Sequence, residues 1–220
     1  MVNYNAAIKK PFSDWKKLTI GAVFFLIPYL NIITGLFATG YTLIVAKSSM
    51  NKERALPEWS NWLDLFIKGL LSFVIGLIYI LPVIIIALAL GSTGLFLSLL
   101  TTQNIVATLL AVGPLVLILV VLSILIAYIT PYAVISYVNQ EDFMQAFKLG
   151  EILQRTFTKI YFKAWIVGIL YSIVVGIITS ILSGLTLFTF IVPLILVGYY
   201  RIIVGITMMT LLGEAFRELK

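Results

Sequence analysis

Cysteine and histidine are both absent from this chain of 220 residues. Their absence excludes disulfide bonds, thiol nucleophiles, haem ligation by histidine and ordinary zinc sites. It also removes the side chain that most often serves as a general base near neutral pH. The sequence offers no other catalytic constellation and no metal-ligand pattern. We therefore expect a protein that is not an enzyme and that binds no metal and no cofactor.

Charged residues are scarce as well. Only 11% of the residues are charged and 61% are hydrophobic, whereas soluble domains carry about 25% charged residues. A deficit of this size predicts that the lipid bilayer is the main solvent of the chain. The net charge of +6 does not indicate nucleic acid. The basic residues stand beside apolar stretches, where they are expected to bind anionic lipid headgroups and to set the orientation of the chain.

The few charged residues are gathered in clusters. All except Arg201 fall within residues 9–17, 47–68, 141–163 or 214–220. The uncharged stretches between the clusters are long enough to cross a bilayer, which needs about 20 apolar residues. We expect one all-α integral membrane domain over residues 1–220, a polytopic transmembrane helix bundle. Its four full spans are predicted at residues 63–90, 105–138, 161–182 and 185–212.

Residues 18–46 allow two interpretations. One straight helix of this length would be about 43 Å long, against a hydrocarbon core of about 30 Å. The sequence Pro28-Tyr29-Leu30-Asn31 interrupts the segment, and because proline removes a backbone donor, Pro28 and Asn31 predict a helix break. The segment is then either one long kinked span or a re-entrant or short-helix hairpin that enters and leaves on the same side.

The distribution of lysine and arginine favours the hairpin. With a hairpin, fourteen of the fifteen Lys and Arg residues lie on one side, and the connections at 91–104 and 183–184 carry no charge. One kinked span would divide these residues four against ten. Cytoplasmic loops carry the excess of Lys and Arg. We therefore predict a multi-pass protein of the cell membrane with both termini in the cytoplasm.

An amphipathic helix is predicted over residues 141–160, at the cytoplasmic surface. Apolar residues recur there at three- and four-residue spacing, and charged residues occupy the opposite face. Such a helix lies at headgroup depth, where it serves as a lipid anchor or as a docking surface for another protein. The residues assigned to it are Phe143, Phe147, Gly150, Glu151, Leu153 and Phe157.

Small residues occur at every fourth position of one predicted span, and we call this pattern the small-residue ridge. In lipid, small side chains let helix backbones approach closely. The ridge therefore predicts a packing surface, either for another span of the same chain or for a second copy in a homodimer. Its members are Ala164, Gly168, Ser172, Gly176, Ser180 and Gly184.

Arg201 stands alone as a charged residue near the middle of a predicted span. A charge at that depth costs about 2.5–3.5 kcal/mol on insertion scales and usually faces the bundle interior. Arg201, with the neighbouring Tyr199 and Tyr200, is therefore a candidate site for an anion or a lipid headgroup. The alternative is that Arg201 snorkels to the membrane surface. Further helix breaks are predicted at Pro131 and Pro193.

Short motifs are spread along nearly the whole chain. They include Lys10-Pro11-Phe12, Ile27-Pro28, Leu56-Pro57-Glu58-Trp59, Ala146-Phe147 followed by Gly150-Glu151, and Gly213-Glu214-Ala215-Phe216-Arg217. Together they resemble a family of uncharacterised membrane proteins, domain of unknown function four-zero-one-three. The resemblance implies a polytopic bacterial or archaeal membrane protein, and it implies no activity.

The sequence leaves two main functions open. The first is a non-enzymatic scaffold or accessory subunit, in envelope maintenance or in immunity to membrane-active peptides, with another membrane protein as its partner. The second is a transporter or channel subunit with an anion or lipid-headgroup site at Arg201, because broken helices often line substrate paths. An intramembrane enzyme ranks last, since its catalytic groups would have to come from hydroxyls, amides and Arg201.

Overall fold

The computed structural model describes residues 2–26, 31–101, 105–189 and 191–219, and these residues contain helices and no strand. The all-α fold predicted from the sequence is confirmed. Within these described residues, four helices hold segments long and apolar enough to cross a membrane, at Trp62–Ala89, Val116–Gln140, Lys159–Leu185 and Ile191–Leu219. The elements, with η for a 3-10 helix, are α1 (Tyr4–Lys9), η1 (Lys10–Ser13), α2 (Trp15–Val23), α3 (Asn31–Met50), α4 (Trp62–Thr101), α5 (Ile105–Gln140), η2 (Phe143–Phe147), α6 (Leu149–Thr156), α7 (Lys159–Leu185), η3 (Leu187–Thr189) and α8 (Ile191–Leu219).

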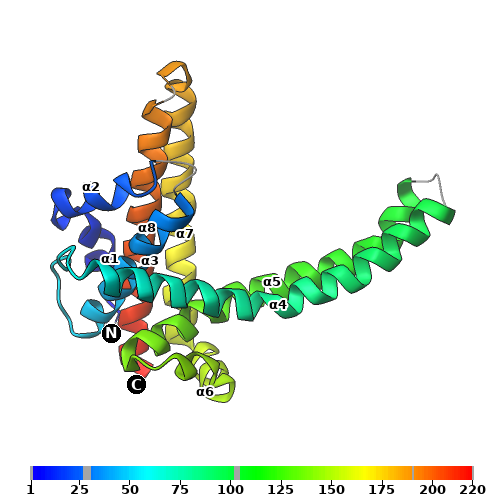
Figure 1. Ribbon diagram of the computed structural model, residues 1–220, viewed down its shortest axis with the longest axis horizontal. Helices are drawn as coiled ribbons and strands as arrows, with labels where there is room; N and C mark the ends of the chain where they lie inside the picture. The colour runs from blue at the N-terminus through cyan, green and yellow to red at the C-terminus, as the bar shows by residue number, and fades with distance from the viewer. Residues whose placement is uncertain (1, 27–30, 102–104, 190, 220) are drawn as a thin grey trace.

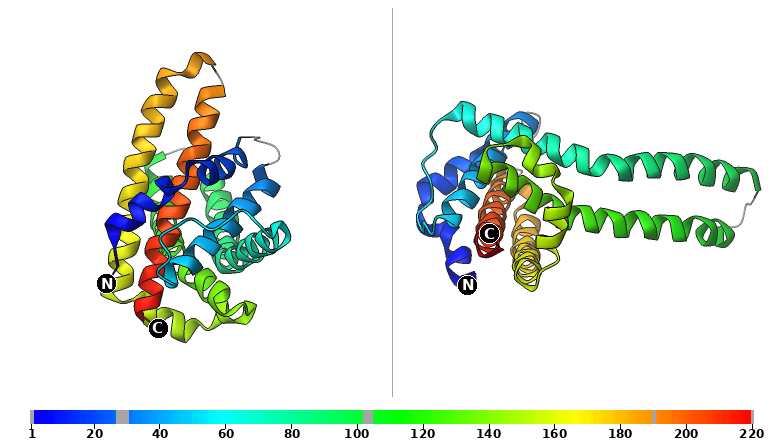
Figure 2. Two further views of the ribbon diagram at one scale, coloured as in Figure 1. Left: turned by 90° about the vertical axis from the view of Figure 1, so that its left-hand side faces the viewer. Right: turned by 90° about the horizontal axis from the view of Figure 1, so that it is seen from below.

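The four long helices form two hairpins that project in different directions from a common base (Figure 1). In that view α7 and α8 run side by side upward, whereas α4 and α5 extend together to the right. Figure 2 shows the same divergence from two further sides. With 40 and 36 residues, α4 and α5 are about 60 and 54 Å long at 1.5 Å per residue. Each exceeds the thickness of a hydrocarbon core, so each must tilt or emerge from the bilayer.

The predicted ends of several helices are wrong. The helix α4 continues to Thr101 and α7 to Leu185, so residues 91–101 and 183–184 are helical rather than connections. The predicted breaks at Pro131 and Pro193 lie inside α5 and α8. Pro193 sits in the first turn of α8, where a missing N–H leaves no intrahelical bond unmade. Pro131 precedes the fully packed stretch 132–138, whose tertiary contacts hold the helix together.

Residues 18–46 do not form one continuous helix. The chain forms α2, which ends at Val23, and α3, which begins at Asn31, so the break predicted at Asn31 is present. Pro28 lies outside the described residues. With nine residues, α2 is about 14 Å long and too short to cross a bilayer. It packs on α8, while α3 packs on α4, α5 and α8. The hairpin model, in which both ends stay on one side, remains a prediction.

Burial within the chain is concentrated at the base. One apolar cluster packs the second half of α5 against the start of α7 and the end of α8, around Tyr132, Tyr161 and Leu211. A second packs α2 and α3 against the middle of α8, around Tyr41 and Ile206. Among the side chains that the structure describes, those on the projecting parts of the hairpins are instead mostly apolar and exposed. Apolar surface of that extent is what a lipid-facing helix presents.

Glycine allows the helices at the base to cross with their backbones almost in contact. A Cβ atom added to Gly40 would lie 1.9 Å from the carbonyl oxygen of Leu65, and one added to Gly69 would lie 1.9 Å from that of Leu36. The crossing of α3 and α4 therefore admits no side chain at either position. The equivalent contacts of α8 with α2 and α3 are Gly198 against Ala22 and Gly213 against Ala46.

The single helix predicted over residues 141–160 is wrong. The chain forms the short η2, then α6, and α7 begins at Lys159. Tertiary hydrogen bonds explain the interruption. The Tyr79 hydroxyl donates to the carbonyl oxygen of Ala146, and the Tyr128 hydroxyl donates to the carbonyl oxygen of Thr156. These carbonyl groups are thereby used by α4 and α5 rather than by a continuous helix.

The predicted apolar face of this segment is divided between core and surface. Ala146 is buried, and Phe143 and Phe147 are half-buried. Leu153 and Phe157 are exposed, as are Gly150 on this face and Glu151 on the opposite, charged face. The residues that the helical period places on one face therefore do not share one environment.

Candidate functional site

Charged clusters that are far apart in the sequence meet at the base of the molecule, in what we call the polar junction. It comprises α1, η1, the loop 51–61, the segment 141–158 and the last turns of α8. Both chain ends lie at this side, and the described parts of the two hairpins lead away from it (Figures 1 and 2). The polar junction is therefore where a functional site built from charged residues must be sought.

One part of the polar junction is a set of contacts that fastens the loop 51–61, and we call it the loop anchor. The ammonium group of Lys17 on α2 donates to the carbonyl oxygen of Leu56 at 2.9 Å and pairs with the Glu58 carboxylate at 2.7 Å. The hydrogen bond with Glu58 raises the pKa of Lys17. Asp14 caps α2 by accepting the Lys17 backbone N–H at 3.1 Å, which lowers the pKa of Asp14.

Trp59 completes the loop anchor. Its indole N–H donates to the carbonyl oxygen of Lys17 at 2.9 Å, and its ring stacks on Tyr41 of α3 with the centroids 3.8 Å apart. The Tyr41 hydroxyl donates to the carbonyl oxygen of Pro57 at 3.0 Å. Every residue of the Leu56-Pro57-Glu58-Trp59 motif thus holds the loop to α2 or α3. The sequence shows the motif, but its partners become visible only in the fold.

Lys10 is a buried lysine beside the loop anchor, with 4% of its surface exposed. Its ammonium group donates to Ser48 Oγ at 3.0 Å, to Ser49 Oγ at 2.8 Å and to the carbonyl oxygen of Glu53 at 2.9 Å. All three of its donors are therefore used. Burial lowers the pKa of Lys10 to about 8, and the negative charges of Glu214 and Glu53 act in the opposite direction. Lys10 ties η1 to the end of α3 and to the following loop.

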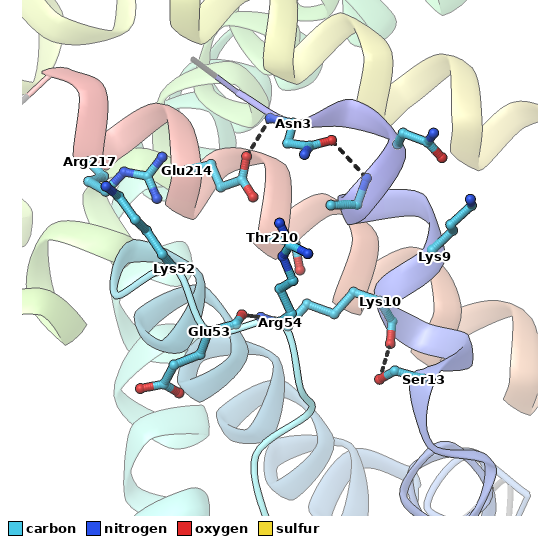
Figure 3. Close-up of a pocket in the computed structure, with 12 residues that line it drawn as sticks. Asn3, Lys9, Lys10, Ser13, Lys52, Glu53, Arg54, Thr210, Glu214 and Arg217 are labelled. Atoms are coloured by element: carbon cyan, nitrogen blue, oxygen red, sulfur yellow. Dashed lines mark hydrogen bonds between the residues drawn. The ribbon is translucent and has the colours of Figure 1, made fainter.

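A pocket of about 550 Å³ opens next to Lys10, between α1, the loop and the end of α8 (Figure 3). One wall is fixed by Glu214, whose Oε2 accepts the backbone N–H of Asn3 at 2.6 Å. Another is fixed by Arg217, which donates to the carbonyl oxygen of Ser49 at 3.3 Å. The charged lining consists of the basic residues Lys9, Lys10, Lys52, Arg54 and Arg217 and the acidic residues Glu53 and Glu214. The pocket is thus predominantly positive.

The motif Ala146-Phe147 with Gly150-Glu151 makes a second set of contacts at the polar junction. The hydroxyl of Tyr79 on α4 donates to the carbonyl oxygen of Ala146 at 2.6 Å. Glu151 pairs with Arg155 at 3.0 Å, and Arg155 donates to the carbonyl oxygen of Leu219 at the end of α8. This motif therefore fastens η2 and α6 to the base of one hairpin and to the end of the other.

Comparison with known families agrees with the resemblance seen in the motifs. The model of the DUF4013 family, described as a protein of unknown function, matches residues 22–184. The chain belongs to the DUF4013 family. The matched region of this DUF4013 protein includes the motif Leu56–Trp59 of the loop anchor and the contacts of Ala146 and Glu151. No match was found among curated proteins or among solved structures.

The prediction from the sequence that Arg201 faces the interior of the bundle is wrong for this DUF4013 protein. Its side chain is exposed on α8, and the guanidinium carbon lies 5.4 Å from the centroid of the Phe25 ring. The neighbouring Tyr199 hydroxyl is 2.8 Å from Thr19 Oγ1, and Tyr200 is half-buried. The next residue of α8, Ile202, is fully buried in the second apolar cluster, so this turn of α8 presents Ile202 and not Arg201 to the interior. An anion or lipid-headgroup site at Arg201, Tyr199 and Tyr200 stays a prediction.

The small-residue ridge faces α8 from Ala164 to Gly176 and turns away from it beyond that residue. Ala164 and Gly168 are buried, and a Cβ atom at Gly168 would lie 2.2 Å from Met208 Sδ. A Cβ atom at Gly176 would lie 3.4 Å from the Tyr200 ring, whereas one at Gly184 would meet nothing within 4 Å. Four residues advance about 400°, so the ridge turns away from its neighbour by about 40° per step. Ser172 is accordingly half-buried and Ser180 exposed.

Proposed function

We propose that this DUF4013 protein is a non-enzymatic scaffold or accessory subunit in envelope maintenance or in immunity to membrane-active peptides. The observation that carries the proposal is that the polar motifs of the chain hold its own elements together. The side chains of Lys17, Glu58 and Trp59 are engaged in holding the loop 51–61 to its neighbours, and Arg155 joins α6 to the end of α8. Polar groups used in this way hold the base of the molecule in one arrangement. The long apolar hairpins that project from it present surfaces on which other membrane components can dock.

The proposal places both termini in the cytoplasm. Its support is the gathering of the basic clusters at the polar junction, because cytoplasmic segments carry the excess of Lys and Arg. The chain has no native thiol, so a single cysteine introduced at Lys52 or at Thr189 is the only group in it that a thiol reagent labels. An impermeant thiol reagent should label Thr189→Cys in intact cells and Lys52→Cys only after lysis. The reverse labelling pattern would contradict this orientation.

We also propose that α6 lies at the membrane surface. Leu149, Leu153 and Phe157 are exposed on one short segment that follows the end of α5, and apolar side chains at such a place suit the headgroup boundary. Phe157→Ser should increase cleavage of residues 148–158 by added protease in membranes. Thermal stability in detergent should fall only slightly, because the mostly exposed Phe157 loses its ring contact with Tyr128. Equal protection of the segment before and after the substitution would instead indicate that a protein partner covers it.

A scaffold needs a partner, and affinity purification from native membranes tests for one. The wild-type chain should recover a second protein in a stoichiometric amount. Two pairs of exposed residues test which hairpin holds the partner, Ile85 with Leu88 on α4 and Ile177 with Ile181 on α7. Replacing one of the two pairs by alanine should reduce recovery, and unchanged recovery with both would contradict docking on the exposed faces of the hairpins. A monodisperse, solitary protein would contradict the scaffold. A bound solute on that solitary protein would support the transporter or channel alternative.

A further inference from the structure

We propose that the pocket between α1, the loop 51–54 and the end of α8 binds a phosphate-type anion, supplied either by a phospholipid headgroup or by a free phosphate compound. This binding site is separate from the scaffold role and does not depend on it. The inference rests on the charge of the lining, on a basic side chain that has no partner, and on a buried hydroxyl that has none.

The two carboxylates of the pocket do not cancel its five positive charges. Glu214 is held in the wall by the backbone N–H of Asn3, 2.6 Å from its Oε2. The Glu53 side chain points away from the centre of the pocket in Figure 3, and its backbone carbonyl oxygen is the acceptor for Lys10. The positive charges therefore dominate the open volume. A concave surface with an excess of one sign of charge attracts counter-ions more strongly than a flat one does.

Arg54 supplies the group best suited to such an anion. Its side chain is exposed and points into the pocket toward Thr210 (Figure 3). Within residues 2–26, 31–101, 105–189 and 191–219, its guanidinium group has no hydrogen bond and no ion pair. The planar guanidinium fork matches the oxygens of a phosphate group and can donate two parallel hydrogen bonds to them.

Thr210 faces the same volume from α8. It is 2% exposed, and its hydroxyl has no hydrogen-bond partner in the part of the chain that the structure describes. Buried polar atoms in folded proteins are nearly always hydrogen-bonded, and an unpaired one carries a desolvation penalty. An unpaired hydroxyl in the lining of the positive pocket, near a guanidinium group without a partner, offers an anion in the pocket a second hydrogen-bond donor.

Lys10 has a different part in this site. Its three donors already bind Ser48, Ser49 and Glu53, so it fixes the wall and contributes charge without donating to the anion. The direct contacts are assigned to Arg54 and Thr210. This division predicts which substitutions reduce binding and which reduce folding.

The test uses the full-length protein in detergent, with two probes. Inorganic phosphate is titrated at constant ionic strength against chloride, and phosphatidylglycerol is supplied in mixed micelles; thermal unfolding and native mass spectrometry are the readouts. A ligand that binds only the folded state raises the midpoint of unfolding. A response to phosphate assigns a free phosphate compound. One retained lipid that phosphate does not displace assigns a headgroup, and either response supports the anion site.

Three variants distinguish the site from general attraction of charge. Thr210→Val should weaken binding of the responding probe about tenfold, the loss expected for one hydrogen bond to a charged group, and Arg54→Gln should weaken it more, because it removes a charge and two such bonds. Lys148→Gln is the control, because it makes the same charge change at an exposed residue outside the pocket. Thr210→Val should not lower the stability of the ligand-free protein, since its hydroxyl has no partner to lose.

Two results would overturn the proposal. The first is the absence of any shift with either probe, which would show that the pocket binds no phosphate-type anion. The second is equal binding by Arg54→Gln, Thr210→Val and Lys148→Gln, which would reduce the effect to the overall positive charge of the polar junction.

Discussion

The polar junction and the projecting hairpins belong to one chain but are stabilised in different ways. At the polar junction, side-chain hydrogen bonds join different elements, as Trp59 joins the loop to α2 and Lys10 joins η1 to α3. In the hairpins, hydroxyls return to their own helix, as Ser123 does to the carbonyl oxygen of Leu119 and Thr186 to that of Leu182. The arrangement of elements is therefore specified at the base, and the projecting helices need only remain helical and apolar.

This difference predicts unequal tolerance of substitution along the same helix. At the base, even a small added side chain would clash with backbone atoms or with buried polar groups, which cannot move aside. Along the hairpins, added methyl groups meet lipid, and the bilayer adapts to them. Pairs of identical substitutions, one at a packed position and one at an exposed or open position, test the comparison most directly.

The largest effect is expected at the crossing of α3 and α4. Gly69→Ala places a Cβ atom 1.9 Å from the Leu36 carbonyl oxygen, so the helices must separate, at a cost of about 3 kcal/mol or more, the upper end for overpacked cores. Gly76→Ala, seven residues further along α4, meets nothing within 4 Å and should be neutral or slightly stabilising, because alanine favours helix over glycine. Thermal unfolding in detergent measures both variants. Equal midpoints would refute the close crossing.

The next effect concerns the pH dependence that Lys10 gives to the polar junction. The pKa of Lys10 is about 8 in the folded protein, against 10.5 for the free side chain. Between these values the unfolded chain binds more protons than the folded one, so stability should rise as the pH rises from about 8 to 10.5. The gain is at most about 3 kcal/mol, at 1.36 kcal/mol per pKa unit.

Lys10→Met should lack this rise in stability, while the neighbouring Lys9→Met should keep it, because Lys9 is exposed. Unfolding midpoints at several pH values for the three proteins isolate the contribution of Lys10 from that of other groups. Parallel pH profiles for wild type and Lys10→Met would show that the buried ammonium group does not change its protonation in this range.

A smaller effect is expected when the loop anchor is opened. Trp59→Ala removes the stack on Tyr41 and the hydrogen bond to Lys17, and because Trp59 is half-buried the loss should be about 2 kcal/mol, below the range for core aromatics. Trp15→Ala, at a residue 61% exposed, should change stability little. Similar losses in both variants would mean that Trp59 acts only as a membrane-boundary residue.

The smallest effect is expected within the small-residue ridge. Gly168→Ala brings a Cβ atom 2.2 Å from Met208 Sδ, and since a methionine side chain can move aside, the cost should be about 1 kcal/mol. Gly184→Ala meets nothing within 4 Å and should not destabilise the monomer. A loss at Gly184 as large as that at Gly168 would show that the outer half of the ridge is also packed, against a second copy.

The sequence predicts the long apolar helices of the fold well, because continuous apolar stretches between charged clusters mark them regardless of tertiary contacts. It fails where an apolar connection and an apolar helix look alike, as at residues 91–101, which are helical. It also fails at residues 141–160, where a 3.6-residue period suggests one helix. There the hydroxyls of Tyr79 and Tyr128 take up backbone carbonyl groups, and no local pattern reveals such partners.

The candidate site was even less accessible from the sequence. Arg201 attracts notice because it is alone among apolar residues, yet the fold leaves it on the surface beside Phe25. Nothing in the sequence marks Arg54 or Thr210 as functional, since Arg54 is an arginine in a loop and Thr210 is a hydroxyl residue in an apolar helix. They lie 156 positions apart in the numbering of the chain and meet only because α8 ends beside the loop that follows α3.

Composition and the order of apolar and charged segments determined that this chain is an all-α, multi-pass membrane protein, because the transfer of apolar surface and of charge between water and lipid depends on residue type and hardly on neighbours. The tertiary structure alone decided how the two hairpins diverge, which glycines lie at the crossings, and which charged residues share a pocket. Those outcomes depend on contacts of a few ångströms between residues distant in the sequence, such as Gly69 with Leu36 and Lys10 with Ser49.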